Sequence, residues 1–90
     1  MPASYEQAMT LTGDLHARPA GALAVTAAKF SSAVSLTVGT SRADARSVLG
    51  VMGLGATSGQ RITVTAEGPD AEEAVTTILA ILAQATRVGA

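Results

Sequence analysis

The sequence predicts an α+β protein, an open-faced β-sandwich in which three helices cover one face of a four-stranded, mainly antiparallel sheet. Four short segments alternate apolar and polar side chains, a pattern typical of strands with one buried face. The two longer helical segments each carry a single apolar stripe, and each stripe must be buried against the sheet. The predicted element order is β-α-β-β-α-β-α.

The strands are predicted from their period of two residues. They cover residues 5–11, 34–38, 42–44 and 61–66. In the first strand, Gln7 interrupts an otherwise apolar face. In the last strand, Ile62, Val64 and Ala66 alternate with polar residues, which indicates a half-buried strand. A turn at residues 39–41 reverses the chain between the second and third strands.

The helices are predicted at residues 18–30, directly after Ser47, and at residues 70–86. Pro19 suits the first turn of a helix, where its missing N–H leaves no bond unmade. The short second helix is weakened by glycines and is expected to end at Gly55. Asp70 can act as the N-cap of the last helix, with Glu73 three residues on, as in a capping box. Residues 87–90 are expected to form a tail.

Composition excludes several classes of function. Ninety residues are expected to form a single domain, residues 1–90. Six basic residues are scattered against seven acidic ones, which argues against a partner made of nucleic acid. Without cysteine and with one histidine, we expect no metal site and no cofactor. No apolar run is long enough to span a bilayer, and no signal peptide is recognised. We therefore expect a cytoplasmic protein that does not insert into membranes.

The stretch GDLHARPAGAL, residues 13–23, holds that histidine at the start of the first helix. With His16 at the N-cap, the first-turn amides of Ala17, Arg18 and Ala20 have no earlier partner in the helix and can bind an anion. Arg18 adds a cation whose planar fork matches phosphate oxygens. A neutral imidazole beside such a site can capture a phosphoryl group. The alternative is a surface histidine beside a solvated arginine.

LHARPA, residues 15–20, resembles the active-site signature of HPr, the histidine-containing phosphocarrier of the phosphoenolpyruvate-dependent sugar phosphotransferase system (PTS). The likeness continues through AAKF, RSVLGVMGLG, ITVTAEGPDAEEA and the last helix, and so covers nearly the whole chain. The resemblance implies that Nδ1 of His16 accepts a phosphoryl group from phospho-enzyme I and passes it to enzyme IIA domains. It also implies that Arg18 and the N–H groups of Ala17 and Arg18 hold the phosphoryl oxygens. A carrier that exchanges partners quickly needs no stable oligomer, so we expect a monomer.

One departure from the family pattern lies beside the histidine. The family usually has glycine where this chain has Asp14, and Asn or Ser where it has Gly13. A carboxylate near the imidazole would oppose an arriving phosphate. We therefore expect Asp14 to be turned to solvent.

Ser47 has two interpretations. Serine is a preferred N-cap for the short helix that follows. The resemblance also aligns Ser47 with the serine that HPr kinase phosphorylates in many Gram-positive bacteria, and a phosphate is compatible with a helix N-cap. Both interpretations can hold together, and HPr kinase/phosphorylase is a candidate partner.

Five of the seven residues after Ser47 are apolar, which is more than one buried face of so short a helix is expected to hold. Its apolar residues are Val48, Leu49, Val51, Met52 and Leu54. Either all belong to the core, or some form a docking patch for partners. The predicted docking residues are Leu49, Met52, Gly53 and Leu54, and the resemblance places Gly50 beside them. Nearby positions that are often lysine in the family are apolar here, such as Val25 and Ala28, so we expect docking to depend on apolar contact.

Two other functions stay open. The chain could be an HPr-type carrier of a regulatory branch, such as a nitrogen-type PTS or a dihydroxyacetone kinase relay. It could also be a small α+β ligand-binding module with no phosphocarrier role.

Overall fold

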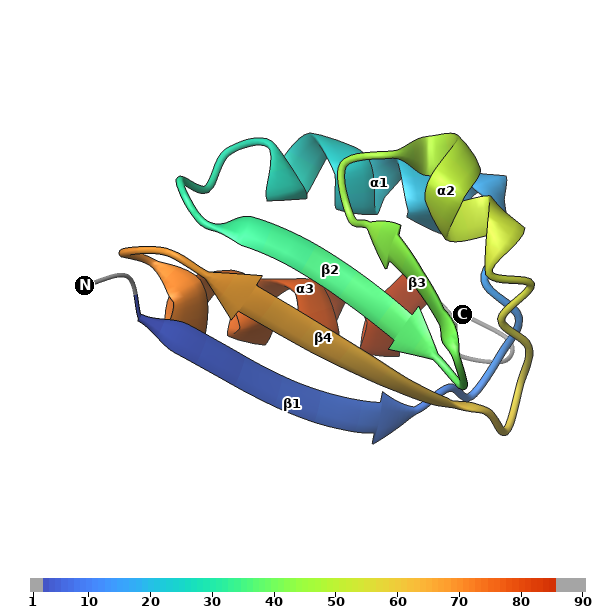
Figure 1. Cartoon of the computed structure of the whole chain (residues 1–90). Coiled ribbons are helices and arrows are strands. Elements are labelled where there is room, and N and C mark those ends of the chain that lie inside the picture. Colours follow the sequence, from blue (N-terminus) through green and yellow to red (C-terminus); the bar gives the residue numbers. More distant parts are fainter. Residues whose placement is uncertain (1–2, 86–90) are drawn as a thin grey trace.

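The computed structural model describes residues 3–85 and has the predicted element order (Figure 1). The elements are β1 (Ser4–Thr10), α1 (Ala17–Ala27), β2 (Ala33–Val38), β3 (Ser41–Asp44), α2 (Val48–Gly53), β4 (Arg61–Glu67) and α3 (Ala71–Ala85). The four strands form one sheet in the order β1-β4-β2-β3, and every neighbouring pair is antiparallel. The predicted fold class is confirmed.

The three helices form one layer against the sheet. Figure 1 shows α3 behind the strands and α1 with α2 along the upper border. The α3 helix packs against β1, β4 and β2, whereas α2 packs between α1 and β3. The core between the layers is built from aliphatic side chains, with Leu23 of α1, Leu36 of β2 and Ile78 of α3 fully buried.

The strand register explains why Gln7 can stand on the apolar face of β1. Gln7 pairs with Val64, Val64 with Leu36, and Leu36 with Ala43, so these four side chains share the core-facing side of the sheet. Val64, Leu36 and Ala43 are buried, but β1 is an edge strand and Gln7 is exposed. The polar residue therefore lies at the border of the core.

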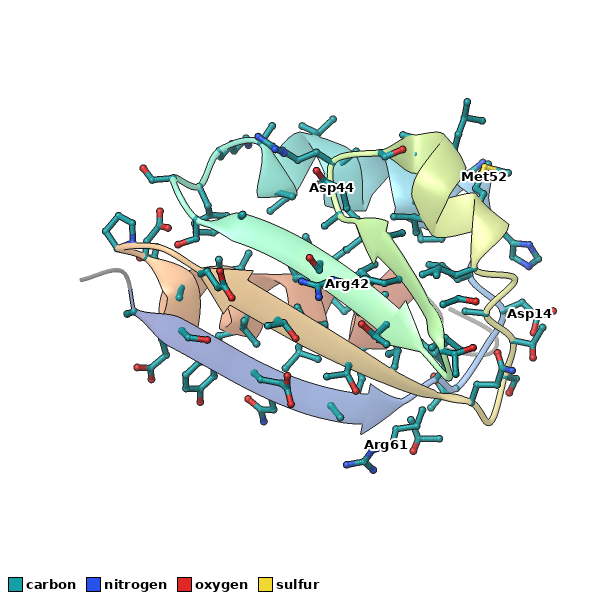
Figure 2. All side chains as sticks on the ribbon, in the orientation of Figure 1. Asp14, Arg42, Asp44, Met52 and Arg61 are labelled. Atoms are coloured by element: carbon teal, nitrogen blue, oxygen red, sulfur yellow. The ribbon has the colours of Figure 1, made fainter. Side chains whose placement is uncertain are left out.

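The opposite face of the sheet is polar and open. Thr65 of β4 donates to the Glu6 carboxylate of β1 at 3.1 Å, and Arg42 of β3 donates to the Ser35 hydroxyl of β2 at 3.1 Å. Figure 2 shows Arg42 lying across this open face.

The first helix ends earlier than predicted, at Ala27 and not at residue 30. The amides of Lys29 and Phe30 donate to carbonyls three residues back, at 3.0 and 3.2 Å, which marks a tightened final turn. The next amides, of Ser31 and Ser32, donate to the Asp70 carboxylate at 2.9 and 2.8 Å. This contact draws the chain out of the helix.

The last helix begins at Ala71 as expected, but the carboxylate of Asp70 serves another purpose. Both of its oxygens accept hydrogen bonds from Ser31 and Ser32. The Asp70 amide, which a capping box would bond to the Glu73 side chain, donates to the Ser32 hydroxyl at 3.2 Å. Among the hydrogen bonds of residues 3–85, none joins Asp70 to the Glu73 side chain, so the predicted capping box is wrong. The end of the predicted helix at residue 86 and the predicted tail lie outside the described residues.

Candidate functional site

The loop before α1 is held against the loop before β4. The amide of Leu11 donates to the Gln60 carbonyl, and the amide of Gly59 donates to the Leu11 carbonyl, both at 2.9 Å. Four residues later, the amide of Leu15 donates to the Ala56 carbonyl at 3.0 Å. The side chains of Leu15 and Ala56 are both buried. The residue before the histidine is therefore anchored by its backbone and by its side chain.

His16 occupies the N-cap position of α1, as predicted. Its backbone is extended, with φ −95° and ψ −179°. The His16 carbonyl accepts from the Ala20 amide at 3.1 Å, so the prediction that the Ala20 amide is free to bind an anion is wrong. The imidazole makes no capping hydrogen bond and is exposed. The ring is consequently accessible to a reactant or a partner protein.

The first turn of α1 presents free amides next to this ring. Within residues 3–85, the N–H groups of Ala17 and Arg18 find no hydrogen-bond acceptor, and both residues are exposed. Pro19 has no N–H to satisfy, and its ring is buried. An anion at this end of the helix could accept from both amides and from the Arg18 guanidinium.

Asp14 is exposed, as expected, and it has a partner that the sequence did not indicate. Its Oδ1 atom accepts from the Ser58 amide at 2.9 Å. Figure 2 shows Asp14 on the loop at the same end of the molecule as Met52 of α2. Asp14 and Ser58 are 44 positions apart, and the only sign in the sequence was the unusual carboxylate at position 14.

Ser47 is the N-cap of α2. Its hydroxyl oxygen accepts from the Gly50 amide at 3.0 Å, and its carbonyl accepts from the Val51 amide at 2.9 Å. The side chain is exposed. The helix ends as predicted, with Gly55 at a φ of +61° directly after the C-cap residue Leu54.

The α2 helix divides its apolar residues between core and surface. Val51 is fully buried, whereas Leu49 is 83% exposed and Met52 is 42% exposed. Gly53 is also exposed, but Leu54 is half-buried and packs against the core. Of the predicted docking residues, Leu54 is therefore the least accessible, since its position after α2 turns it toward the core.

The α1 helix also carries exposed apolar side chains. Val25 is 64% exposed and Ala28 is exposed as well. The helices α1 and α2 pack against each other, so His16, Leu49 and Met52 belong to neighbouring elements. A partner that covers His16 can contact α2 at the same time.

The part of the chain that the structure describes contains neither a candidate metal site nor a candidate membrane-spanning helix. No group of three or more histidine or acidic side chains could hold a metal ion within residues 3–85. Nor does any helix within those residues combine the length and the apolar character that spanning a bilayer requires.

Fold and site together define a class of α+β proteins in which an exposed histidine occupies the N-cap position of a helix beside a four-stranded antiparallel sheet. A family model described as the PTS HPr component phosphorylation site matches residues 6–84. The chain belongs to the HPr family, the phosphocarrier proteins of the PTS.

Individual relatives agree with this assignment. The chain is 36% identical over 76 residues to the phosphocarrier protein HPr of Mycoplasma capricolum, an alignment that covers 84% of this chain and 85% of the relative. It is 39% identical over 69 residues to the phosphocarrier protein HPr of Cupriavidus necator, covering 77% and 78% of the two chains. The crystal structure of HPr from Bacillus anthracis superposes with a TM-score of 0.82 at 30% identity and covers 89% of this chain and 98% of that one.

Proposed function

We propose that this chain is a phosphocarrier that accepts a phosphoryl group on Nδ1 of His16 from phospho-enzyme I and delivers it to enzyme IIA domains during PTS sugar uptake. In each transfer the bond from phosphorus to its donor breaks as the bond to its acceptor forms, so the group moves without hydrolysis. The observation that carries this proposal is an exposed imidazole at a helix N-terminus, inside the segment that matches the HPr family. This imidazole makes no hydrogen bond to the helix that it precedes.

The residues around His16 have distinct roles in this proposal. The amides of Ala17 and Arg18 donate to the phosphoryl oxygens, and the Arg18 guanidinium neutralises their charge. Phosphoryl transfer requires mainly positioning and charge stabilisation, which preformed amides supply with little reorganisation. The protein needs no cofactor and no metal for this chemistry.

Partners dock on the surface formed by the exposed part of α2. The proposed docking residues are Leu49, Met52 and Gly53 of α2, with Leu54, which follows the helix and is half-buried, at the border of this surface. Their support is the exposure of Leu49 and Met52 next to α1. Ser47 is a candidate phosphorylation site for HPr kinase, supported by its exposed hydroxyl at the N-cap. The carrier is a cytoplasmic protein with one domain, residues 1–90. It acts as a monomer, because it must exchange partners quickly.

The test is phosphorylation by purified enzyme I and phosphoenolpyruvate. We expect a mass increase of one phosphate that is labile in acid and stable in base, and its absence in His16→Ala. Because His16 is exposed, the variant should keep the fold, and circular dichroism serves as the control. An unmodified wild-type protein would contradict the proposal. The IIA domain that accepts the group would distinguish sugar uptake from a regulatory branch.

A further inference from the structure

We propose that Asp14 is a positioning residue for His16, because its carboxylate ties the loop before the histidine to the loop before β4. The inference rests on the proposed role of His16 as phosphoryl acceptor. It concerns a residue at which this chain departs from the family pattern.

The hydrogen bonds between the two loops differ in what they depend on. The bonds at Leu11 and Leu15 join backbone atoms, so they survive any side chain at those positions. The bond between them, from the Ser58 amide to Oδ1 of Asp14 at 2.9 Å, depends on the side chain. A carboxylate acceptor makes a stronger bond to an amide than a neutral acceptor does. Asp14 therefore adds a fixing point two residues before the histidine.

His16 needs such a fixing point because, within residues 3–85, no hydrogen bond holds its ring. The imidazole is exposed and makes no capping hydrogen bond. Its position therefore depends on the backbone of the loop that carries it. A shift of the loop before His16 would change the distance from the imidazole to the amides of Ala17 and Arg18. Group transfer is sensitive to displacements of this kind.

The same hydrogen bond also fixes the position of the negative charge of Asp14. A carboxylate that could turn toward a phosphoryl group on His16 would repel it. The Ser58 amide holds one carboxylate oxygen on the other loop. The contact thus fixes the loop and keeps the charge in place.

Three variants separate these effects. Asp14→Asn keeps a carbonyl oxygen that can accept from Ser58 and removes the charge. Asp14→Ala removes the acceptor. Ser58→Ala is the matched control, since alanine keeps the backbone N–H. The measurements are the single-turnover rate of His16 phosphorylation by phospho-enzyme I across a range of pH, and hydrogen exchange of the Ser58 amide in the unphosphorylated protein.

We expect Asp14→Ala to be phosphorylated about three- to tenfold more slowly, with faster exchange of the Ser58 amide by a similar factor. Asp14→Asn should remain within about twofold of wild type and keep its pH profile, because it keeps the acceptor. Ser58→Ala should match wild type in both measurements.

Three results would overturn the inference. An Asp14→Ala protein that is phosphorylated at the wild-type rate has no need of the contact. Equal slowing in the Asn and Ala variants would assign the effect to charge and not to position. An Asp14→Ala protein that is unfolded would make Asp14 a residue of global stability. Failure of the proposed function is recognised separately, because the wild-type protein would then take up no phosphate at all.

Discussion

The backbone of Gly68 lies so close to Ser32 that a Cβ atom on Gly68 would stand 2.6 Å from the Ser32 Cα atom. Gly68 also has a φ of +147°, which L side chains rarely adopt. Ser32 is the only buried polar residue within residues 3–85, and its hydroxyl donates a hydrogen bond to the Asp70 carboxylate. These contacts join the end of β4, the loop after α1 and the start of α3.

Gly68→Ala should therefore destabilise the protein by about 2–4 kcal/mol, because both the close contact and the backbone conformation oppose a side chain. Urea unfolding measures this change. Gly21→Ala is the matched control, since a Cβ at that position in α1 meets nothing within 4 Å and alanine favours a helix. The control should be more stable by about 0.5–1 kcal/mol. Equal stability of the two variants would contradict the close approach.

Asp70 should make stability depend on pH in acid. Hydrogen bonds from the Ser32 side chain and the Ser31 amide lower the pKa of Asp70 below its usual value of 3.8. The ionised form is favoured in the folded protein, so this stabilisation is complete above about pH 4 and is lost as pH falls through the lowered pKa. Unfolding midpoints from pH 7 to about pH 2.5 measure the loss.

Asp70→Asn should reduce that acid dependence, and Ser32→Ala should reduce it as well by removing a donor. Some dependence will remain, because the backbone hydrogen bond from Arg46 lowers the pKa of Asp44. If both variants retain the full wild-type slope, the hydrogen bonds to Asp70 do not stabilise its ionised form.

Loss of the α2 N-cap should be measurable apart from any phosphorylation. Ser47→Ala removes the acceptor for the Gly50 amide and should cost about 1 kcal/mol. Ser47→Asp should recover most of this loss, since aspartate is also a good N-cap. Ser31→Ala is the control, because Ser31 contributes a backbone amide that alanine keeps. A Ser47→Ala protein as stable as wild type would show that the cap does not contribute.

Arg18 should affect the rate of transfer without affecting the fold. Its side chain is exposed, so Arg18→Ala should leave the unfolding midpoint unchanged. Phosphorylation should become about 10- to 100-fold slower, because the charge opposite the phosphoryl oxygens is lost. Arg18→Lys should recover part of the rate, since lysine restores the charge but not the planar fork. Full activity of Arg18→Ala would remove this residue from the site.

Docking should depend on apolar contact more than on charge. Leu49→Ala should weaken enzyme I binding about tenfold and leave stability unchanged, because the side chain is 83% exposed. The wild-type affinity should change little between about 50 and about 300 mM salt, measured by titration calorimetry. A steep loss of affinity over that range would contradict an apolar docking surface.

The sequence alone predicted the fold class and the position of the histidine, because both depend on local patterns. Strand alternation is visible in β4, whose Ile62, Val64 and Ala66 are all fully buried. The proline at position 19 and the glycine at position 55 mark helix ends, since their backbone preferences act within one or two residues. These features need no knowledge of what lies across the fold.

Contacts between distant segments had to come from the tertiary structure. Asp70 has the local pattern of a capping residue, yet its carboxylate accepts from Ser31 and Ser32, 38 and more positions earlier, and α1 ends before them. Asp14 meets Ser58 in the same way, and Leu54 turns to the core while Leu49 stays on the surface. A polar side chain with several reachable donors bonds to the donors that the folded backbone places nearest, and a linear pattern does not contain that distance.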